Sequence, residues 1–353
     1  MTLPPPTAPE RLPLLDGMRG IAAIAVMLFH EAGLHGPRGF LSHSFLAVDF
    51  FLLLSGFVLA RAFEPRFAKG LGTRAFMAMR LKRLYPLMAL GTVLGAAHAL
   101  LGGQAGGDVA QLLAMGLLFV PMLAGPAEIF PLNGPQWSLL TELAINLAHA
   151  SGLARLPRLA LLAISGASAL LILRAAMRYG TLDLGWQQVG IWVGPVRAGF
   201  GYVLGIVLAR TISPAVSATR LAWLAPLVLL PAMMWTMALF PPVPGLFADW
   251  AVLTAGFPLL LVLALRTGAP DAATPILDWL GRLSFPLYAV HLPLLGLAAL
   301  VAKAHPDLAL PVRLAGVVLA LGAAAWLGKA PVSRGRARSS TAPGSALPTG
   351  SVA

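Results

Sequence analysis

The chain has 353 residues, of which 58% are hydrophobic and 11% are charged, and its formal net charge at pH 7 is +12. Soluble domains usually carry about 25% charged residues, so this composition indicates a membrane protein. Nucleic-acid binding is excluded as the cause of the positive charge, because the lysines and arginines stand beside apolar runs rather than on a polar domain. The absence of cysteine excludes disulfides, thiolate nucleophiles and cysteine-based metal sites.

Apolar runs of about 17 to 22 residues recur along the chain, each long enough to cross a hydrocarbon core about 30 Å thick. In chain order the predicted spans are 14–33, 44–62, 85–102, 137–153, 158–175, 190–210, 220–240, 248–266, 284–303 and 310–328. A further stretch, 109–124, is short and runs into Pro121, Gly125 and Pro126, so we expect it to be re-entrant or interfacial. The predicted fold is an all-α polytopic membrane bundle of about ten transmembrane helices plus this one re-entrant or interfacial segment.

Basic residues predict the orientation of the bundle, because cytoplasmic segments are enriched in lysine and arginine. The segment between the second and third spans holds Arg61, Arg66, Lys69, Arg74, Arg80, Lys82 and Arg83. We therefore expect this segment and both termini to be cytoplasmic. Residues 64–84 also interleave basic and apolar side chains, which predicts an amphipathic interfacial helix. The domain division is then a cytoplasmic segment 1–13, a membrane domain 14–330 and a disordered cytoplasmic tail 331–353.

Arg19 and His30 lie eleven residues apart on the first predicted span. Eleven steps of about 100° return to the same face of a helix, and the two side chains are separated by about 16 Å along its axis. Ionisable groups inside a bilayer are costly and each calls for a functional hypothesis. Two interpretations stay open for Arg19, which either pairs with Asp16 or serves a substrate. His30 is either a hydrogen-bonded packing residue or a general base.

Asp49 on the second span is expected at the depth of His30, where a carboxylate beside the imidazole would suit a general base. Glu142 lies about one and a half turns below Trp137, a residue typical of the interfacial belt. Glu142 either binds acceptor hydroxyls, tunes His30, or satisfies a buried serine or Asn146. Arg197 is expected to pair with Glu142 or with an anionic acceptor. His291, predicted near mid-membrane, shares a helix face with Tyr288 and Ser284 and either packs or lines a passage.

Five motifs occur in an order that resembles acyltransferase family 3, the integral membrane O-acyltransferases that modify bacterial surface glycans and some small molecules. The matching segments are Leu15 to Ala23 with Phe29-His30, Val48 to Phe57, Arg80 to Pro86, Trp137 to Glu142, and Leu283 to His291. Each motif alone is weak, but five in order cover nearly the whole chain. The sequence departs from the family pattern after Glu142, where Asn146, Leu147 and Ala148 replace a frequent aromatic residue.

The resemblance implies an O-acetyltransferase that moves an acetyl or other acyl group from cytoplasmic acyl-CoA to a hydroxyl of an extracytoplasmic glycan or glycoside. The implied catalytic residues are His30, Arg19, Asp49 and Glu142, and the implied donor-binding residues are Arg80 and Arg83. Ser55, Trp137, Arg197, Tyr288 and His291 are candidates for the acyl passage or for acceptor binding. No permanently bound cofactor, metal or nucleic acid is expected. The expected location is the bacterial cytoplasmic (inner) membrane, in contact with membrane lipid.

Two other classes of protein remain as alternatives to an enzyme. A polytopic transporter would use buried histidine, aspartate and glutamate to bind substrate or protons. Such a fold is typically built from inverted repeats with broken helices, and no internal repeat is visible in this sequence. A polytopic interaction or sensing protein would not require Arg19 and His30 to share one helix face. The identity of the acceptor, the acyl group and the existence of an acyl-enzyme stay open.

Overall fold

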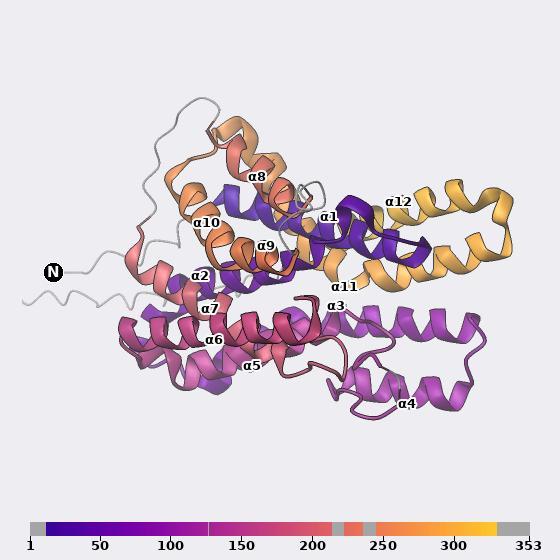
Figure 1. Cartoon of the computed structure of the whole chain (residues 1–353), viewed down its shortest axis with the longest axis horizontal. Coiled ribbons are helices and arrows are strands. Elements are labelled where there is room, and N and C mark those ends of the chain that lie inside the picture. The colour runs from indigo at the N-terminus through magenta and orange to yellow at the C-terminus, as the bar shows by residue number, and fades with distance from the viewer. Residues whose placement is uncertain (1–11, 126, 214–221, 236–244, 330–353) are drawn as a thin grey trace, which may run out of the picture.

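The computed structural model describes residues 12–125, 127–213, 222–235 and 245–329 (Figure 1). Within these residues the regular structure is helical, with one isolated bridge between Glu128 and Gln187. Eight segments are long and apolar enough to cross a membrane: Pro13–His35, Gly39–Ala68, Thr73–Leu101, Arg158–Tyr179, Val193–Thr211, Gly245–Arg266, Asp271–Ala304 and Pro306–Leu327. The predicted all-α polytopic membrane bundle is confirmed. The predicted disordered tail, 331–353, lies outside the described residues.

The described helices are labelled α1 to α12 in Figure 1. They are α1 (Pro13–His35), α2 (Ala47–Ala68), α3 (Thr73–Leu101), α4 (Gly106–Leu117), α5 (Gln136–Ser151), α6 (Arg158–Tyr179), α7 (Val193–Thr211), α8 (Leu224–Trp235), α9 (Gly245–Ala251), α10 (Phe257–Arg266), α11 (Thr274–Ala304) and α12 (Ala309–Leu327). A short π-helical segment, Val252–Gly256, joins α9 to α10. Pro286 and Pro293 lie inside α11.

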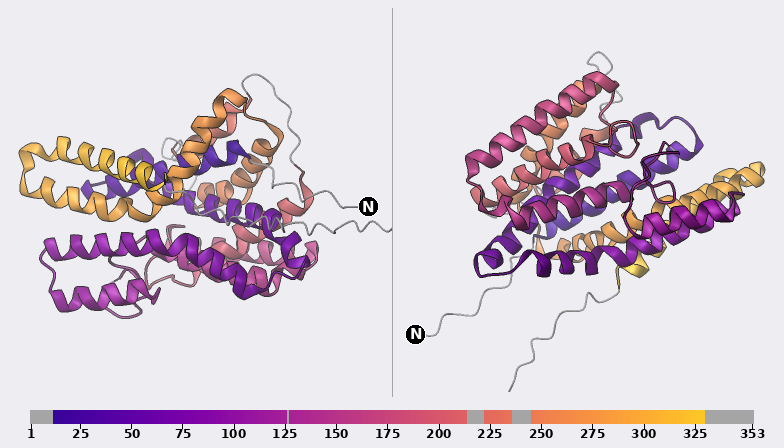
Figure 2. Two further views of the ribbon diagram at one scale, coloured as in Figure 1. Left: turned by 180° about the vertical axis from the view of Figure 1, so that it is seen from behind. Right: turned by 90° about the horizontal axis from the view of Figure 1, so that it is seen from below.

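Helix α11 lies at the centre of the contacts and packs against α1, α3 and α12, whereas α2 packs against α7 and α7 against α6. Helices α1 and α11 run parallel, because Gly17 lies against Leu277, Gly20 against Leu280 and His30 against His291. The α3–α4 and α11–α12 hairpins extend toward the same end of the molecule (Figures 1 and 2). We call this end, where α1 and α11 finish, the His30 end, and the opposite end the Arg19 end.

Glycines allow α2 and α7 to approach at backbone distance. A methyl group at Gly56 would lie 2.0 Å from the carbonyl oxygen of Tyr202, and one at Gly205 would lie 2.2 Å from the carbonyl oxygen of Leu53. Small residues at helix crossings are typical of membrane bundles, where close packing rather than the hydrophobic effect drives association. This crossing fixes the relative height of α2 and α7, and with it the side chains that face each other across it.

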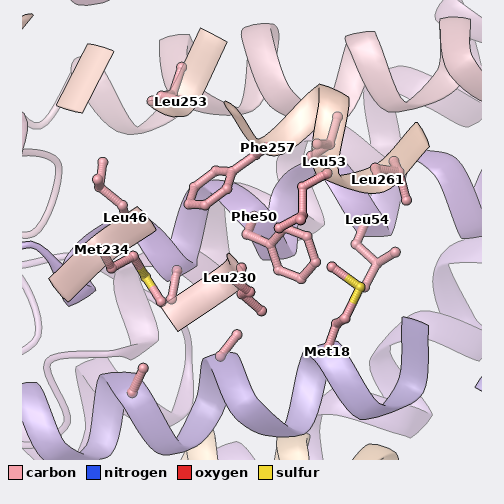
Figure 3. Packing of buried hydrophobic residues seen from close by; sticks show 14 of the residues in the cluster. Met18, Leu46, Phe50, Leu53, Leu54, Leu230, Met234, Leu253, Phe257 and Leu261 are labelled. Atoms are coloured by element: carbon pink, nitrogen blue, oxygen red, sulfur yellow. The ribbon is translucent and has the colours of Figure 1, made fainter. Parts of the chain in front are cut away.

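An apolar cluster formed by α1, α2, α8 and α10 fixes the first two helices against the rest of the bundle (Figure 3). Its labelled members are Met18, Leu46, Phe50, Leu53, Leu54, Leu230, Met234, Leu253, Phe257 and Leu261. The rings of Phe50 and Phe257 meet edge to face, with their centroids 5.6 Å apart. Close packing of this kind gains dispersion energy from many small contacts. The polar side chains of α1 and α2 are therefore held on rigid helices.

Several predicted boundaries differ from those observed. The predicted spans 137–153 and 220–240 contain α5 and α8, which have 16 and 12 residues, and part of 220–240 lies outside the described residues. Helix α4, in the place of 109–124, has 12 residues and packs on α3, so it is shorter than a membrane span. The separate amphipathic helix at 64–84 was a wrong prediction, because these residues form the end of α2 and the start of α3.

Candidate active site

The imidazoles of His30 and His291 contact each other at the His30 end of the bundle. Nδ1 of His30 lies 3.0 Å from Nε2 of His291, and the two ring centroids are 5.0 Å apart. His291 is completely buried, whereas His30 is partly exposed. His291 lies near the middle of α11, and its contact with His30 was not predicted from the sequence. Helix α11 begins at Thr274 rather than at 284, so His291 lies much further along the helix than the apolar run indicated.

The hydrogen bonds of this histidine pair determine which nitrogens carry protons. Nδ1 of His291 lies 2.9 Å from the carbonyl oxygen of Leu287, and Nδ1 of His30 lies 2.9 Å from that of Val26. A carbonyl oxygen can only accept, so both Nδ1 atoms are donors. Nε2 of His291 then accepts from His30, whose own Nε2 is left unprotonated. Among the described residues no group bonds this nitrogen, which makes it a free proton acceptor.

Asp49 pairs with Arg197 rather than with His30, which corrects the predicted partner of each. Nε of Arg197 donates to Oδ1 of Asp49 at 2.8 Å, and its Nη2 donates to Oδ2 at 2.6 Å. Both side chains are almost completely buried, with exposed fractions of 1% and 3%. A bidentate guanidinium–carboxylate pair is among the strongest polar contacts available in a protein. This pair joins α2 to α7 beside the crossing at Gly56.

Arg197 is held by two further contacts. Its Nη1 donates to the carbonyl oxygen of Leu184 at 2.7 Å, and its guanidinium lies 5.3 Å from the ring centroid of Trp137. Trp137 is therefore not a residue of the interfacial belt, as its position in the sequence had predicted. It is buried and packs with Val48, Ile129 and Phe130 beneath the arginine. Each guanidinium nitrogen of Arg197 thus donates at least one hydrogen bond, and its role in the structure is to hold Asp49.

A second polar group lies toward the Arg19 end and is centred on Glu142. Oε1 of Glu142 accepts a hydrogen bond from Nη2 of Arg80 at 2.6 Å and another from the hydroxyl of Ser55 at 2.8 Å. Arg80 is buried, because α3 begins at Thr73 and places it two turns inside the helix. Of the predicted roles for Glu142, the structure shows a contact with a serine, although Ser55 is only partly buried. The predicted pairing of Glu142 with Arg197 was wrong.

Arg19 and Arg83 belong to the same group. Nη2 of Arg19 contacts Oδ1 of Asp16, the intrahelical pair that the spacing had predicted as one alternative. Arg19 also lies close enough to Arg83, Glu142 and Arg80 for their charges to act on it. Arg83 is exposed, whereas Arg80 is already committed to Glu142. Helices α1 and α3 thus bring three arginines together beside Glu142 of α5, an arrangement suited to a multiply charged anion.

Tyr288 and Ser138 lie between the histidine pair and the Glu142 group. The hydroxyl of Ser138 is 2.6 Å from that of Tyr288, and the Tyr288 and His291 rings are 6.1 Å apart between centroids. Both residues are buried. Ser138 stands one helical turn before Glu142 on α5, so Ser138 and Glu142 share a face of the helix. Ser138 was not selected as a site residue from the sequence, although it lies inside one of the motifs.

Loops cover the bundle at the His30 end. The backbone N–H of Ile129 donates to the carbonyl oxygen of Trp186, and that of Gln188 donates to Ala127, so two distant loops are joined. Burial raises the pKa of Glu128 and of Asp183 in these loops. No group of three or more metal-ligating side chains occurs in the part of the chain that the structure describes.

This fold and this site define a multi-pass membrane protein with an imidazole pair at one depth and an arginine group at another. Residues 12–329 match the family described as "Acyltransferase domain". The chain belongs to acyltransferase family 3, as its five motifs had predicted, and is a membrane O-acyltransferase. Two individual proteins are similar to this chain.

One relative, "Protein 2 in picA locus" of Rhizobium radiobacter, is 35% identical over 189 residues, which cover 48% of this chain and 97% of the relative. Another, "Acyltransferase MdmB" of Streptomyces mycarofaciens, is 28% identical over 320 residues, which cover 80% of this chain and 78% of the relative. No solved structure matches the chain. The family assignment therefore comes from sequence similarity alone. The positions of the side chains come from the structure of this chain.

Proposed function

We propose that this enzyme takes an acetyl or other acyl group from acyl-CoA on the cytoplasmic side and transfers it to a hydroxyl of a glycan or glycoside on the other side. The Arg19 end would face the cytoplasm and the His30 end would face outward, in a bacterial inner membrane with both termini inside. The observation that carries this proposal is the His30–His291 contact, because it leaves one imidazole nitrogen free to accept a proton beside the partly exposed end of α1.

His30 acts in this proposal as the general base. The acceptor oxygen forms a bond to the carbonyl carbon of the thioester as Nε2 of His30 takes the hydroxyl proton. The carbon–sulfur bond then breaks, and the proton passes from His30 to the departing thiolate, so the base is restored. Proton transfer by a positioned side chain of this kind contributes about 10²–10⁴ in rate. The orienting partner of the base is His291 in place of the predicted carboxylate.

The arginine group is proposed to bind the phosphates of the donor. Guanidinium groups match phosphate oxygens in geometry as well as in charge. Arg83 is the arginine most open to a ligand, and Arg19 shares its surroundings. Arg80 is proposed to position the group rather than to bind the donor, because its ion pair with Glu142 holds α3 against α5. The vertical separation of Arg19 and His30, about 16 Å on one helix, fits a donor that extends between the two sites.

Transfer from labelled acyl-CoA by purified protein in detergent or in vesicles tests this proposal. We expect acyl-CoA to be consumed and the label to appear on an added glycoside, with the His30→Ala variant binding the donor but not transferring the label. Hydrolysis without an acceptor would also show donor use. A protein that consumes no acyl-CoA but carries a glycoside or protons across vesicles would instead be a transporter, the alternative class.

A further inference from the structure

Arg38 lies beside the histidine pair in the loop that follows α1. Its guanidinium carbon is 4.1 Å from the ring centroid of Phe29, and the Phe29 and His30 rings are 5.2 Å apart between centroids. The charge of Arg38 therefore acts on the His30 imidazole. Arginines on this side of the bundle run against the usual bias of basic residues toward the cytoplasm. The position of Arg38 thus calls for a reason other than membrane orientation.

The guanidinium of Arg38 has no anionic partner within the described residues. Its Nε is buried and makes no hydrogen bond there. A buried N–H without an acceptor is rare in folded proteins and calls for an explanation such as a missing ligand. By contrast, Arg313, at the same end of the bundle, is bonded to both carboxylate oxygens of Glu31. The nearby Arg197 is paired with Asp49, so among the described residues Arg38 is the arginine beside His30 without a carboxylate partner.

The residues around Arg38 leave space for its guanidinium group and form no ion pair with its charge in the described structure. A methyl group at Gly33 would lie 2.8 Å from Nε of Arg38, so the glycine makes space for the guanidinium. The charge of Arg38 acts on Asp183, but no ion pair joins the two residues in the described structure. Stacking on Phe29 fixes the orientation of the cation without using its hydrogen-bond donors. Arg38 is therefore held in place with its donors free.

We propose that Arg38 selects an acceptor that carries an anionic group, a carboxylate or a phosphate, close to the hydroxyl that receives the acyl group. This inference rests on the proposed function, because it requires the acceptor to approach His30 from the His30 end. An anion bound by Arg38 would place a neighbouring hydroxyl near Nε2 of His30. The guanidinium supplies a fork of donors that fits both carboxylate and phosphate oxygens.

The test compares acyl transfer to nitrophenyl glucoside, to the matching glucuronide and to the glucoside phosphorylated on its primary hydroxyl, with acetyl-CoA as donor. We expect kcat/KM for at least one anionic acceptor to exceed that for the neutral one by about ten- to 100-fold, as for the loss of one charge-assisted hydrogen bond. The two anionic acceptors distinguish a carboxylate from a phosphate site. In Arg38→Gln this preference should disappear, and in Arg38→Lys, which keeps the charge without the fork, it should survive in part.

Arg178→Gln is the matched control, because Arg178 also stacks on a neighbouring aromatic ring, with 5.6 Å between its guanidinium carbon and the Tyr179 centroid, but lies on α6. It should keep the preference. A preference that is retained in Arg38→Gln, or that is absent from the parent enzyme, would overturn the inference while leaving acyl transfer to glycosides intact.

A second measurement separates this inference from the proposed function. Thermal unfolding of the purified full chain is followed with glucuronate, with glucose phosphate and with glucose. We expect one of the anionic sugars to raise the Tm of the parent and of Arg178→Gln but not of Arg38→Gln. If this shift occurs and no glycoside is acylated, the anion site stands and glycoside acylation is wrong. If neither anionic sugar shifts the Tm through Arg38, the inference is wrong.

Discussion

Nδ1 of His30 and Nε2 of His291 are 3.0 Å apart, although the two residues are separated by 261 positions in the chain. The contact exists because α1 and α11 run parallel in register, with glycines of α1 against α11. Together with the carbonyl oxygens of Val26 and Leu287, it assigns a donor role to Nδ1 of His30 and leaves its Nε2 as the acceptor. His291 is therefore a positioning residue in this account, since it acts through His30 and not on the substrate.

Replacing His291 by phenylalanine removes one of the two acceptors of Nδ1 of His30, leaves the carbonyl oxygen of Val26, and keeps an aromatic ring of similar size. We expect kcat to fall by about ten- to 100-fold, which corresponds to the ~1–3 kcal/mol of a buried hydrogen bond, with KM for the donor little changed. His291→Gln, whose side-chain oxygen can still accept from His30, should recover part of kcat. Steady-state kinetics of both variants measure the effect. An equal loss in both variants would point to a packing role for His291.

The Asp49–Arg197 pair predicts a stability effect. Asp49→Asn leaves Arg197 buried without its counter-ion, and breaking a buried pair in this way costs about 3–5 kcal/mol. The variant should lose much of its thermal stability in detergent. The double variant Asp49→Leu with Arg197→Met leaves no charge uncompensated and should recover most of that loss. If Asp49→Asn abolished transfer while the Tm stayed at the parent value, Asp49 would belong to the catalytic machinery, as its sequence position first indicated.

The arginine group predicts different results for its members. Arg83→Ala should raise KM for acyl-CoA, because a charge-assisted hydrogen bond to phosphate is worth about 1.5–3 kcal/mol. Arg80→Ala should also lower thermal stability, since Glu142 loses its partner. Arg83→Lys, which keeps the charge, should lie between Arg83→Ala and the parent. Donor titrations and unfolding curves measure these effects. An unchanged KM in Arg83→Ala would show that this residue serves membrane orientation alone.

Single cysteines introduced at Lys69 and Gly245 test the orientation. The native chain has no cysteine, so the labelling background is clean. Lys69 follows α2 at the Arg19 end, and Gly245 starts α9 close to His43, which precedes α2. We expect an impermeant reagent to label the cysteine at Gly245, but not the one at Lys69, in intact cells. Labelling of both, or of Lys69 alone, would contradict the proposed topology.

The fold was predictable because apolar runs of membrane length are a strong local signal, and those runs mark α1, α2, α3, α6, α7, α11 and α12. The ends of the helices were less predictable. Hydropathy shows how long the apolar run is. The hydrogen-bonded helix can extend beyond that run at either end. The early start of α11 at Thr274 is one example, because the predicted span began only at residue 284.

The residues of the site were predictable as a set, but their pairings were not. Asp49, Arg197, Glu142 and Arg80 all stand out as charges inside apolar helices. Which carboxylate meets which arginine depends on the helix order and rotation, and Asp49 and Arg197 are 148 residues apart. The pairing of Arg19 with Asp16 could be predicted, because the two residues are three positions apart on one helix. Arg38 lies outside the five motifs and was not predicted as a site residue.

The central claim is that Nε2 of His30 accepts the proton of the acceptor hydroxyl, and the most direct test is the transfer rate of His30→Gln at saturating acyl-CoA and acceptor. Glutamine keeps a hydrogen bond but cannot take up a proton at neutral pH. We expect the variant to bind the donor normally and to transfer the acyl group about 10²–10⁴ times more slowly than the parent. A rate near that of the parent would show that His30 is structural and that the proposed catalytic site is wrong.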